Sequence, residues 1–297
     1  VFSPEKLLEE DMDQITVFIA SMYEEEMSRQ LEEYNLRHGV HFFRNVRSYL
    51  RQLASEICTG IEKFKNIHEG KRAFIIGNGP SLKIDDLDLL KNEITFASNN
   101  IHVAFSETAW RPTYYTLIDP LAARNKKDNI RAVPSIKLFP HQIYATLGEM
   151  EKCYWLNGVY AFNREGKIFI KSFPNDIADF VYYGGTVTFF NLQLAYYMGV
   201  KEIYLLGVDF KYNGIPIQEK DAWNYKHSGE LRAHFHPNYF EVGEVLIRPD
   251  MMKHYECFSV ASRFLNEQGV KVYNASRFSE LDLFPRASFD QIVNDFN

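Results

Sequence analysis

The stretch that decides the fold is Phe74-Ile75-Ile76-Gly77-Asn78-Gly79-Pro80-Ser81-Leu82. Its apolar run predicts a buried strand, and the Gly-x-Gly that follows at once predicts a tight turn. At the carboxyl end of a strand, the backbone N–H groups of such a turn can meet a phosphate. The expected phosphate-binding or nucleotide-binding residues are Gly77, Asn78, Gly79, Pro80 and Ser81.

The same turn differs from the two best-known phosphate motifs. Leu82 occupies the third glycine position of the dinucleotide fingerprint, and no Gly-Lys-Ser/Thr of a P-loop follows. The plainer alternative is a strand-to-helix turn in which Ser81 only caps the helix. We favour the binding role because two glycines, an asparagine and a serine converge there.

Outward from this turn, short apolar runs alternate with amphipathic segments. The expected strands are residues 73–76, 95–97, 114–118, 136–139, 202–208 and 270–273, and two expected helices are residues 186–198 and 251–267. Strands that are apolar throughout and separated by helices indicate a parallel sheet covered on both faces. The sequence therefore predicts an α/β fold, with a mostly parallel sheet flanked by helices, over residues 71–297.

Residues 1–70 have a different, helical character. Apolar residues spaced three and four apart between residues 42 and 64 predict one long amphipathic helix, and residues 11–36 form an earlier, less regular helical stretch. Gly39 and Gly70 are the expected stops at the ends of these two stretches. We therefore expect a helical N-terminal extension over residues 1–70. Its apolar stripe either packs on the α/β domain or pairs with a second copy to form a homo-oligomer.

The composition of the 297-residue chain argues against several classes of protein. With 33 Lys and Arg against 39 Asp and Glu, the net charge is −6, which disfavours a broad basic face for nucleic acid. No apolar run approaches the roughly 18 residues of a transmembrane segment. The 24 Phe, 18 Tyr and 3 Trp residues predict an extensive core or a groove lined with rings. Three widely spaced cysteines without Cys-x-x-Cys favour a reducing cytoplasm over a disulfide scaffold or a zinc ribbon.

Polar residues also follow other expected strands. Asn99, Asp119 and Asp209 each stand directly after an apolar run. Because the carboxyl ends of parallel strands share one edge of the sheet, we expect these side chains beside the glycine turn. Asparagine offers donors and acceptors to a base or a sugar, and aspartate accepts from ribose hydroxyls. The alternative for each residue is a purely local role in a turn.

A second candidate anion site precedes the expected helix at residues 186–198. There Gly184-Gly185-Thr186 allows backbone N–H groups to converge at a helix N-terminus, where negative charge is favoured. Gly185 and Thr186 are the expected binding residues.

Two histidines lie in the aromatic stretch His-Phe-His-Pro-Asn-Tyr-Phe at residues 234–240. A loop histidine beside a nucleotide crevice suits a general base, because the free pKa of histidine is near 6.5. His234 and His236 are therefore the candidate catalytic bases, with packing among rings as the equal alternative. His102, His141, His227 and His254 are isolated, and we expect structural or surface roles for them.

Metal-ligand patterns are weak in this sequence. Asp-x-Asp occurs at residues 11–13 and 86–88, but neither follows an apolar strand, where it could hold a metal and a diphosphate. No Gly-x-Ser-x-Gly of a hydrolase occurs either. We therefore expect a transferase without a bound metal.

In this order the motifs resemble a known group of proteins. Residues 74–82, Asn99, residues 185–186 and residues 198–210 together resemble bacterial sialyltransferases of glycosyltransferase family forty-two. Most of residues 71–290 resembles even more closely the bacterial proteins called 6-hydroxymethylpterin diphosphokinase-like. The resemblance implies a Rossmann-like domain that holds a CMP-linked acidic sugar.

The resemblance also implies roles for single residues. The Asn that ends the second strand of the sialyltransferases matches Asn99, whereas Asp119 stands where that family has Asn, which leaves the donor open. Tyr212 and Tyr225 correspond to two tyrosines that touch the leaving phosphate, the first displaced by one position. The family's catalytic histidine lies in a lid after the Gly-x-Asp-Phe strand, and either His234 or His236 is its counterpart.

The expected function is that of a metal-independent, inverting glycosyltransferase. It would move a sialic-acid-like sugar from a CMP-sugar donor to a glycan acceptor in surface polysaccharide or glycoprotein biosynthesis. His236 or His234 would take the acceptor proton. Backbone N–H groups at residues 79–81 and 185–186, with tyrosine hydroxyls, would stabilise the departing phosphate. We expect no cofactor and a cytoplasmic location, with peripheral association with the inner membrane left open.

Two alternatives remain at this stage. A 6-hydroxymethylpterin diphosphokinase would use ATP and Mg²⁺, with Asp119 and Asp209 as metal ligands. A non-catalytic nucleotide-binding module would use the helical stripe at residues 42–64 as its partner surface.

Overall fold

The computed structural model describes residues 4–10, 17–19, 24–44, 46–163, 165–211, 224–229 and 233–294. The chain divides into two compact units, Val1–Cys58 and Thr59–Asn297. Residues 59–70, which the sequence pattern placed in the extension, lie in the second unit. The reason is packing, because Ile61 and Phe64 are buried in the core beneath the sheet.

The first unit is small and mixes helices with two short strands. Its elements are η1 (Pro4–Glu9), β1 (Val17–Phe18), α1 (Glu24–Glu33), β2 (Phe42–Phe43) and α2 (Val46–Ile57). The expectation of one helix over residues 42–64 is wrong, since β2 occupies its start and α2 ends at Ile57. Gly60 then takes a left-handed φ of 76°, which breaks the helical path before the short η2 (Glu62–Phe64).

The second unit is built on a seven-stranded sheet whose strands all run parallel. Its order is β13-β10-β3-β4-β5-β6-β7. The strands are β3 (Arg72–Ile76), β4 (Ile94–Ser98), β5 (Tyr114–Thr116), β6 (Ile136–Pro140), β7 (Cys153–Leu156), β10 (Glu202–Leu206) and β13 (Lys271–Asn274). The predicted α/β fold is confirmed, and the edge strand β7 is the one that the apolar runs did not indicate.

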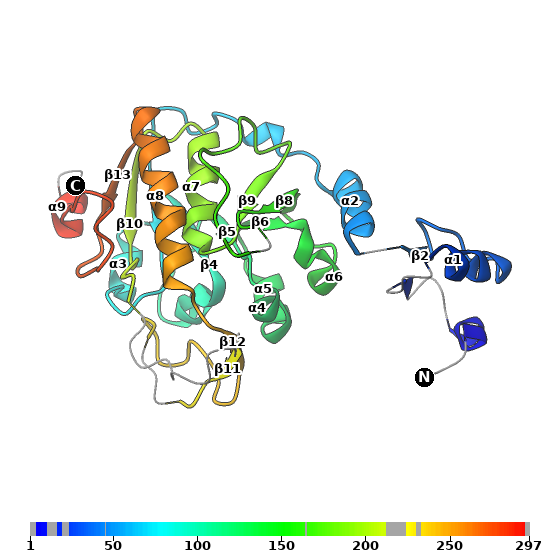
Figure 1. Ribbon diagram of the computed structural model, residues 1–297. Coiled ribbons are helices and arrows are strands. Elements are labelled where there is room, and N and C mark those ends of the chain that lie inside the picture. The colour runs from blue at the N-terminus through cyan, green and yellow to red at the C-terminus, as the bar shows by residue number, and fades with distance from the viewer. Residues whose placement is uncertain are drawn as a thin grey trace. The chain divides into compact units, whose positions relative to one another are not determined.

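Helices cover both faces of this sheet. Figure 1 shows α7 (Val187–Tyr197) and α8 (Met251–Glu267) side by side on one face. Ala73 and Ile75 of β3 enter the large core on that side. The residue between them, Phe74, points to the other face. There its ring packs edge-on against Phe289 of α9 (Phe289–Asn294), with the ring centroids 6.3 Å apart. This alternation follows from the two-residue period of a strand.

Aromatic rings lock three neighbouring strands on that second face. Tyr204 of β10 pairs in register with Phe74 of β3 and with Tyr273 of β13. The Tyr204 ring is stacked on Phe74, with centroids 5.2 Å apart, and on Tyr273 at 5.5 Å. The three rings therefore fix the register across β3, β10 and β13.

The remaining elements connect the strands. They are α3 (Ile84–Asp88), η3 (Asn99–Ser106), α4 (Pro120–Asn125), α5 (Lys127–Ala132), η4 (His141–Ile143), α6 (Tyr144–Leu147), and the two-stranded pairs β8 (Gly158–Tyr160) with β9 (Val181–Tyr183) and β11 (Asn224–Lys226) with β12 (Val245–Ile247). None of the helices in the described ranges combines the length and apolarity that crossing a membrane requires.

Candidate functional site

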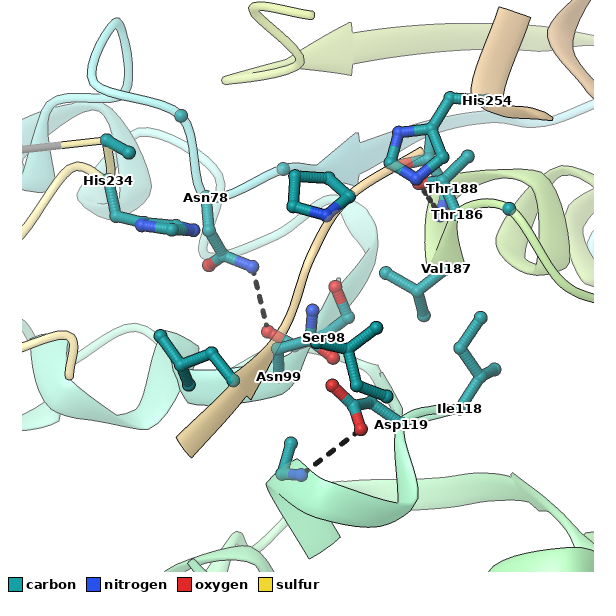
Figure 2. Close-up of a pocket in the computed structure, with 18 of the residues that line it drawn as sticks. Asn78, Ser98, Asn99, Ile118, Asp119, Thr186, Val187, Thr188, His234 and His254 are labelled. Carbon is teal, nitrogen blue, oxygen red and sulfur yellow. Dashed lines mark hydrogen bonds between the residues drawn. The ribbon is translucent and has the colours of Figure 1, made fainter. Parts of the chain in front are cut away.

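The strand order reverses between β3 and β10, and a pocket of about 490 Å³ opens at that point. Strands β4 to β7 follow β3 outward on one side, whereas β10 and β13 return to the other side. In open α/β sheets such a reversal leaves a crevice at the carboxyl edge, where ligands bind. The pocket walls come from the turns after β3, β4, β5 and β10, from the starts of α7 and α8, and from the β11–β12 hairpin (Figure 2).

The two glycines after β3 are required by the neighbouring strand end. A Cβ atom at Gly79 would lie 2.6 Å from the carboxyl carbon of Asp209, and one at Gly77 would collide with the carbonyl of Gly207. Gly207 itself has a φ of 70°, and a Cβ atom there would lie 2.8 Å from the Gly77 carbonyl oxygen. The motif thus allows two backbones to meet at the strand reversal.

The backbone N–H groups of Gly79 and Ser81 are hydrogen-bonded to residues that follow β10. Gly79 donates to the Gly207 carbonyl at 2.8 Å, and Ser81 donates to Oδ2 of Asp209 at 2.7 Å. Pro80 has no N–H. These N–H groups already have protein acceptors, so a departing phosphate would have to displace them.

Asp209 joins the turn to the end of β10. It is 3% exposed, and Ser81 donates its hydroxyl to Oδ1 in addition to its N–H to Oδ2. Burial raises the pKa of Asp209, and the two hydrogen bonds from Ser81 oppose that rise. Asp209 lines the pocket, but both carboxylate oxygens are held by the protein.

Three asparagines of the pocket lining, Asn78, Asn99 and Asn100, have buried side-chain oxygens without a donor in the described part of the chain. The amide nitrogen of Asn78 donates to the Ser98 carbonyl at 3.1 Å (Figure 2), and that of Asn100 donates to the Tyr239 carbonyl at 2.8 Å. Because a carbonyl can only accept, these bonds fix each amide with its oxygen directed the other way. No donor in the described part of the chain reaches Oδ1 of either residue, although Asn100 is only 2% exposed. Buried acceptors of this kind are normally hydrogen-bonded, so a water or a ligand supplies the donor.

Asn99 and Asp119 lie in the same pocket. Asn99 has a left-handed φ of 54°, and its carbonyl accepts from the Tyr115 hydroxyl at 2.6 Å. Asp119 caps α4, with Oδ1 accepting from the N–H of Leu121 at 2.8 Å. Burial raises the pKa of Asp119, against the effect of its backbone hydrogen bonds. The structure therefore brings together the strand-end residues that the sequence singled out.

The start of α7 forms another wall of the pocket. Gly184 and Gly185 have φ values of 118° and 66°, and Thr186 is the N-cap, its hydroxyl accepting from the N–H of Thr188 at 3.3 Å. No acidic residue stands in the first turn of this helix. The pocket therefore meets the positive end of the α7 dipole.

The two candidate bases have different surroundings. His234 lines the pocket, where its ring is stacked on Tyr239 with centroids 4.0 Å apart. Burial, with a smaller contribution from His227, lowers the pKa of His234 to about 3. The Nε2 atom of His236 instead lies 2.7 Å from a carboxylate oxygen of Glu107, and this residue is not among the described pocket residues. Of the two histidines, His234 is the one that lines the pocket.

Three pocket residues at the start of α8 were not expected from the sequence. Arg248, Lys253 and His254 line the pocket, and Figure 2 shows His254 beside Thr186 and Thr188. From the sequence we expect only a structural or surface role for His254. Burial lowers its pKa to about 4, with the Gly185 backbone opposing the shift through a hydrogen bond. The sequence feature that could have indicated these residues is Asp250, an N-cap residue directly before the expected helix 251–267, which starts at the carboxyl edge of the sheet.

The structure describes one of the two tyrosines that were expected to contact the leaving phosphate. Tyr225 of β11 lines the pocket and is 8% exposed. Burial raises its pKa, and the nearby Arg248 opposes that rise. Tyr212 lies outside the described residues.

Comparison with known proteins gives one family match. The profile described as 6-hydroxymethylpterin diphosphokinase MptE-like matches residues 41–214. No curated protein matches the sequence.

Two solved structures are similar at low identity. The MAf glycosyltransferase from Magnetospirillum magneticum AMB-1 matches 80% of this chain with 16% identity and a TM-score of 0.45. The chain spans only 39% of the length of that enzyme. The sialyltransferase CstII from Campylobacter jejuni, solved with the substrate analogue cytidine-5'-monophosphate, matches 74% of this chain and 86% of its own, with 12% identity and a TM-score of 0.40.

Proposed function

This chain belongs to the 6-hydroxymethylpterin diphosphokinase MptE-like family, and on that premise we propose that it is a metal-independent, inverting glycosyltransferase. Its donor is a CMP-linked, sialic-acid-like sugar, and its acceptor is a hydroxyl of a glycan in surface polysaccharide or glycoprotein biosynthesis. The supporting observation is the pair of buried amide oxygens, of Asn78 and Asn100, in a pocket at the strand reversal.

These oxygens match the donors of a cytidine nucleotide. The cytosine amino group and the ribose hydroxyls can donate, and each buried acceptor gains a partner when they do. Asn99, Asp119 and Tyr225 add polar groups to the same walls. A nucleoside therefore fits this part of the pocket, while the start of α7 lies where the charged portion of the donor extends.

His234 is the proposed base of the transfer. The ring is neutral near pH 7, so one ring nitrogen can accept a proton, although the lowered pKa makes it a weaker base than a free histidine. The acceptor hydroxyl loses its proton to that nitrogen as its oxygen bonds to the anomeric carbon. The bond from that carbon to the phosphate oxygen breaks, and its electron pair leaves with CMP. Attack opposite the leaving phosphate inverts the anomeric centre.

The carboxylates of the pocket support a reaction without a bound metal. Both oxygens of Asp209 accept from Ser81, and Oδ1 of Asp119 caps α4. A Mg²⁺ ion in the diphosphokinase alternative would instead be held by one or two of these carboxylates together with the substrate phosphates.

The direct test measures CMP release from CMP-linked sialic acid in EDTA, because water can replace an unknown acceptor. We expect turnover that survives EDTA and falls at least about a hundredfold in His234→Asn, the size of effect typical of a general base. His236→Asn is the matched control and should keep activity within about twofold. Equal activity in wild type and His234→Asn would remove His234 from the role of base.

The family description itself favours a second candidate, a hydroxymethylpterin diphosphokinase. Pterin diphosphate formed from ATP only when Mg²⁺ is present would support it over glycosyl transfer. Binding of CMP without turnover of either substrate would instead indicate a non-catalytic nucleotide-binding module.

A further inference from the structure

The segment from Arg248 to His254 brings positive charge into the pocket at the start of α8. Arg248 and Lys253 both line the cavity, and the Lys253 side chain is only 14% exposed. Its ammonium group lies 5.3 Å from the centroid of the Phe162 ring, within the distance of a cation–π contact.

This segment is joined directly to the amino end of α7. A Cβ atom at Gly185 would lie 3.1 Å from the Lys253 carbonyl, and the Gly184 carbonyl lies 3.7 Å from the Cys257 thiol. The Gly185 backbone also hydrogen-bonds His254. The first turns of α7 and α8 therefore meet at one wall of the cavity, and His254 is a positioning residue between them.

The negative groups of the cavity are held by the protein. Asp250 caps α8, accepting from the N–H of Lys253 at 3.1 Å, and its other oxygen lies 3.5 Å from the Lys253 ammonium. Asp209 is bound by Ser81, and Asp119 caps α4. Lys211, also at the cavity, is paired with Glu280. Arg248 and Lys253 are cationic residues of the lining beside the α7 dipole, and Lys253 itself lies within ion-pair distance of Asp250.

A second observation indicates that the cavity takes a ligand. Asn100 is 2% exposed and its Oδ1 has no donor within the described residues. A ligand that satisfies this oxygen with a nucleoside still has a phosphate to place. The turn after β3 offers it no N–H at Gly79 or Ser81, because both already donate to β10.

We infer that Arg248 and Lys253, with the amino end of α7 at residues 185–188, form the subsite that binds the phosphate of the nucleotide donor. This inference rests on the proposed nucleotide-sugar function. It moves the phosphate from the glycine turn after β3 to the junction of α7 and α8. Charge-assisted hydrogen bonds from the two cations then stabilise the charge that develops on the departing CMP.

The test compares ligands that differ only in the phosphate. Isothermal titration with CMP and with cytidine is carried out on wild type, Arg248→Gln and Lys253→Met, the latter keeping the buried stem. Exposed Lys271→Met, at the amino end of β13, is the matched charge control. We expect each subsite variant to raise the Kd for CMP about tenfold or more and the Kd for cytidine less than twofold. The control should change neither.

Each outcome decides the subsite separately from the proposed function. Unchanged CMP affinity in both variants, or equal losses for CMP and cytidine, overturns the subsite. If wild type binds neither ligand, the cytidine-nucleotide function fails, and pyrophosphate is titrated instead. If wild type binds pyrophosphate and Arg248→Gln and Lys253→Met do not, the subsite is still supported. If wild type does not bind pyrophosphate, or if all variants bind it equally, the subsite is overturned. Arg248→Met and Lys253→Gln, which also remove the charge, replace any variant that does not fold.

Discussion

Ser81 donates both its backbone N–H and its hydroxyl to the carboxylate of Asp209, with the N–H to Oδ2 distance at 2.7 Å. The two residues follow β3 and β10, the strands on either side of the reversal in strand order. Their pairing joins the two strand ends at the pocket, and it explains why a conspicuous phosphate-type motif has no N–H to offer at Ser81, while the N–H of Gly79 donates to Gly207.

Replacing Asp209 with Asn should destabilise the fold by about 2 kcal/mol. The amide retains one acceptor oxygen, and its NH₂ group would face a Ser81 donor in a buried site. Urea denaturation measures the loss, and a double-mutant cycle with Ser81→Ala should show coupling above about 1 kcal/mol. Additive effects of the two substitutions would mean that the pair contributes nothing beyond its separate parts.

Gly79→Ala should cost more stability than Gly70→Ala. The new methyl group at residue 79 meets the Asp209 carboxyl carbon at 2.6 Å, whereas nothing lies within 4 Å of one at residue 70. Gly70 has a φ of 72°, so its replacement costs about 1 kcal/mol through the backbone alone. We expect at least about 2 kcal/mol for Gly79→Ala by thermal or urea unfolding. Equal losses would contradict the close approach of the two strand ends.

Asn78→Ala and Asn100→Ala should weaken nucleoside binding and spare the phosphate. Each removes a buried acceptor from the pocket, so the Kd for cytidine should rise about tenfold. Pyrophosphate affinity should stay within about twofold, the reverse of the pattern for Arg248 and Lys253. Asn100→Ala should also lose stability, because its amide supports the Tyr239 carbonyl. A uniform loss for both ligands would indicate that the pocket had collapsed.

Two buried histidines should make the protein less stable in mild acid. Burial lowers the pKa of His234 to about 3 and that of His254 to about 4, below the roughly 6.5 of an unfolded chain. Between pH 6.5 and those folded values the unfolded chain binds more protons, so stability falls as pH falls. Each histidine should cost about 2 kcal/mol between pH 7 and pH 5. Urea unfolding at both pH values checks this, and His254→Asn should flatten the dependence by its share.

Much of the fold follows from local sequence pattern. Helix α8 coincides with the expected residues 251–267, and α7 begins after Thr186 because a threonine N-cap stands before a long apolar stretch. Strand β7 gave no such signal, because Cys153–Leu156 is a short edge strand beside charged residues. The long helix of residues 42–64 was predicted wrongly, because apolar spacing does not show where a glycine interrupts the backbone.

The candidate site was only partly predictable, for a different reason. Asn78, Asn99 and Asp119 follow successive strands, and parallel topology brings such residues together. The contact of Gly79 with Gly207 requires that β10 pairs with β3. The spacing of apolar residues along the sequence does not indicate that pairing. His234 and His236 are equivalent by spacing, and the carboxylate of Glu107 distinguishes them through a long-range contact.

The stacked rings of Phe74, Tyr204 and Tyr273 have a consequence for binding energy. They span the strands on both sides of the reversal, so the floor of the pocket is already rigid before a ligand arrives. Little conformational entropy is then lost in ordering that floor, and more of the interaction energy appears as affinity. Tyr204→Leu would weaken the stack, so that ligand binding would have to order the floor and the affinity would fall. This loss would occur although residue 204 lies on a strand and not in the pocket lining.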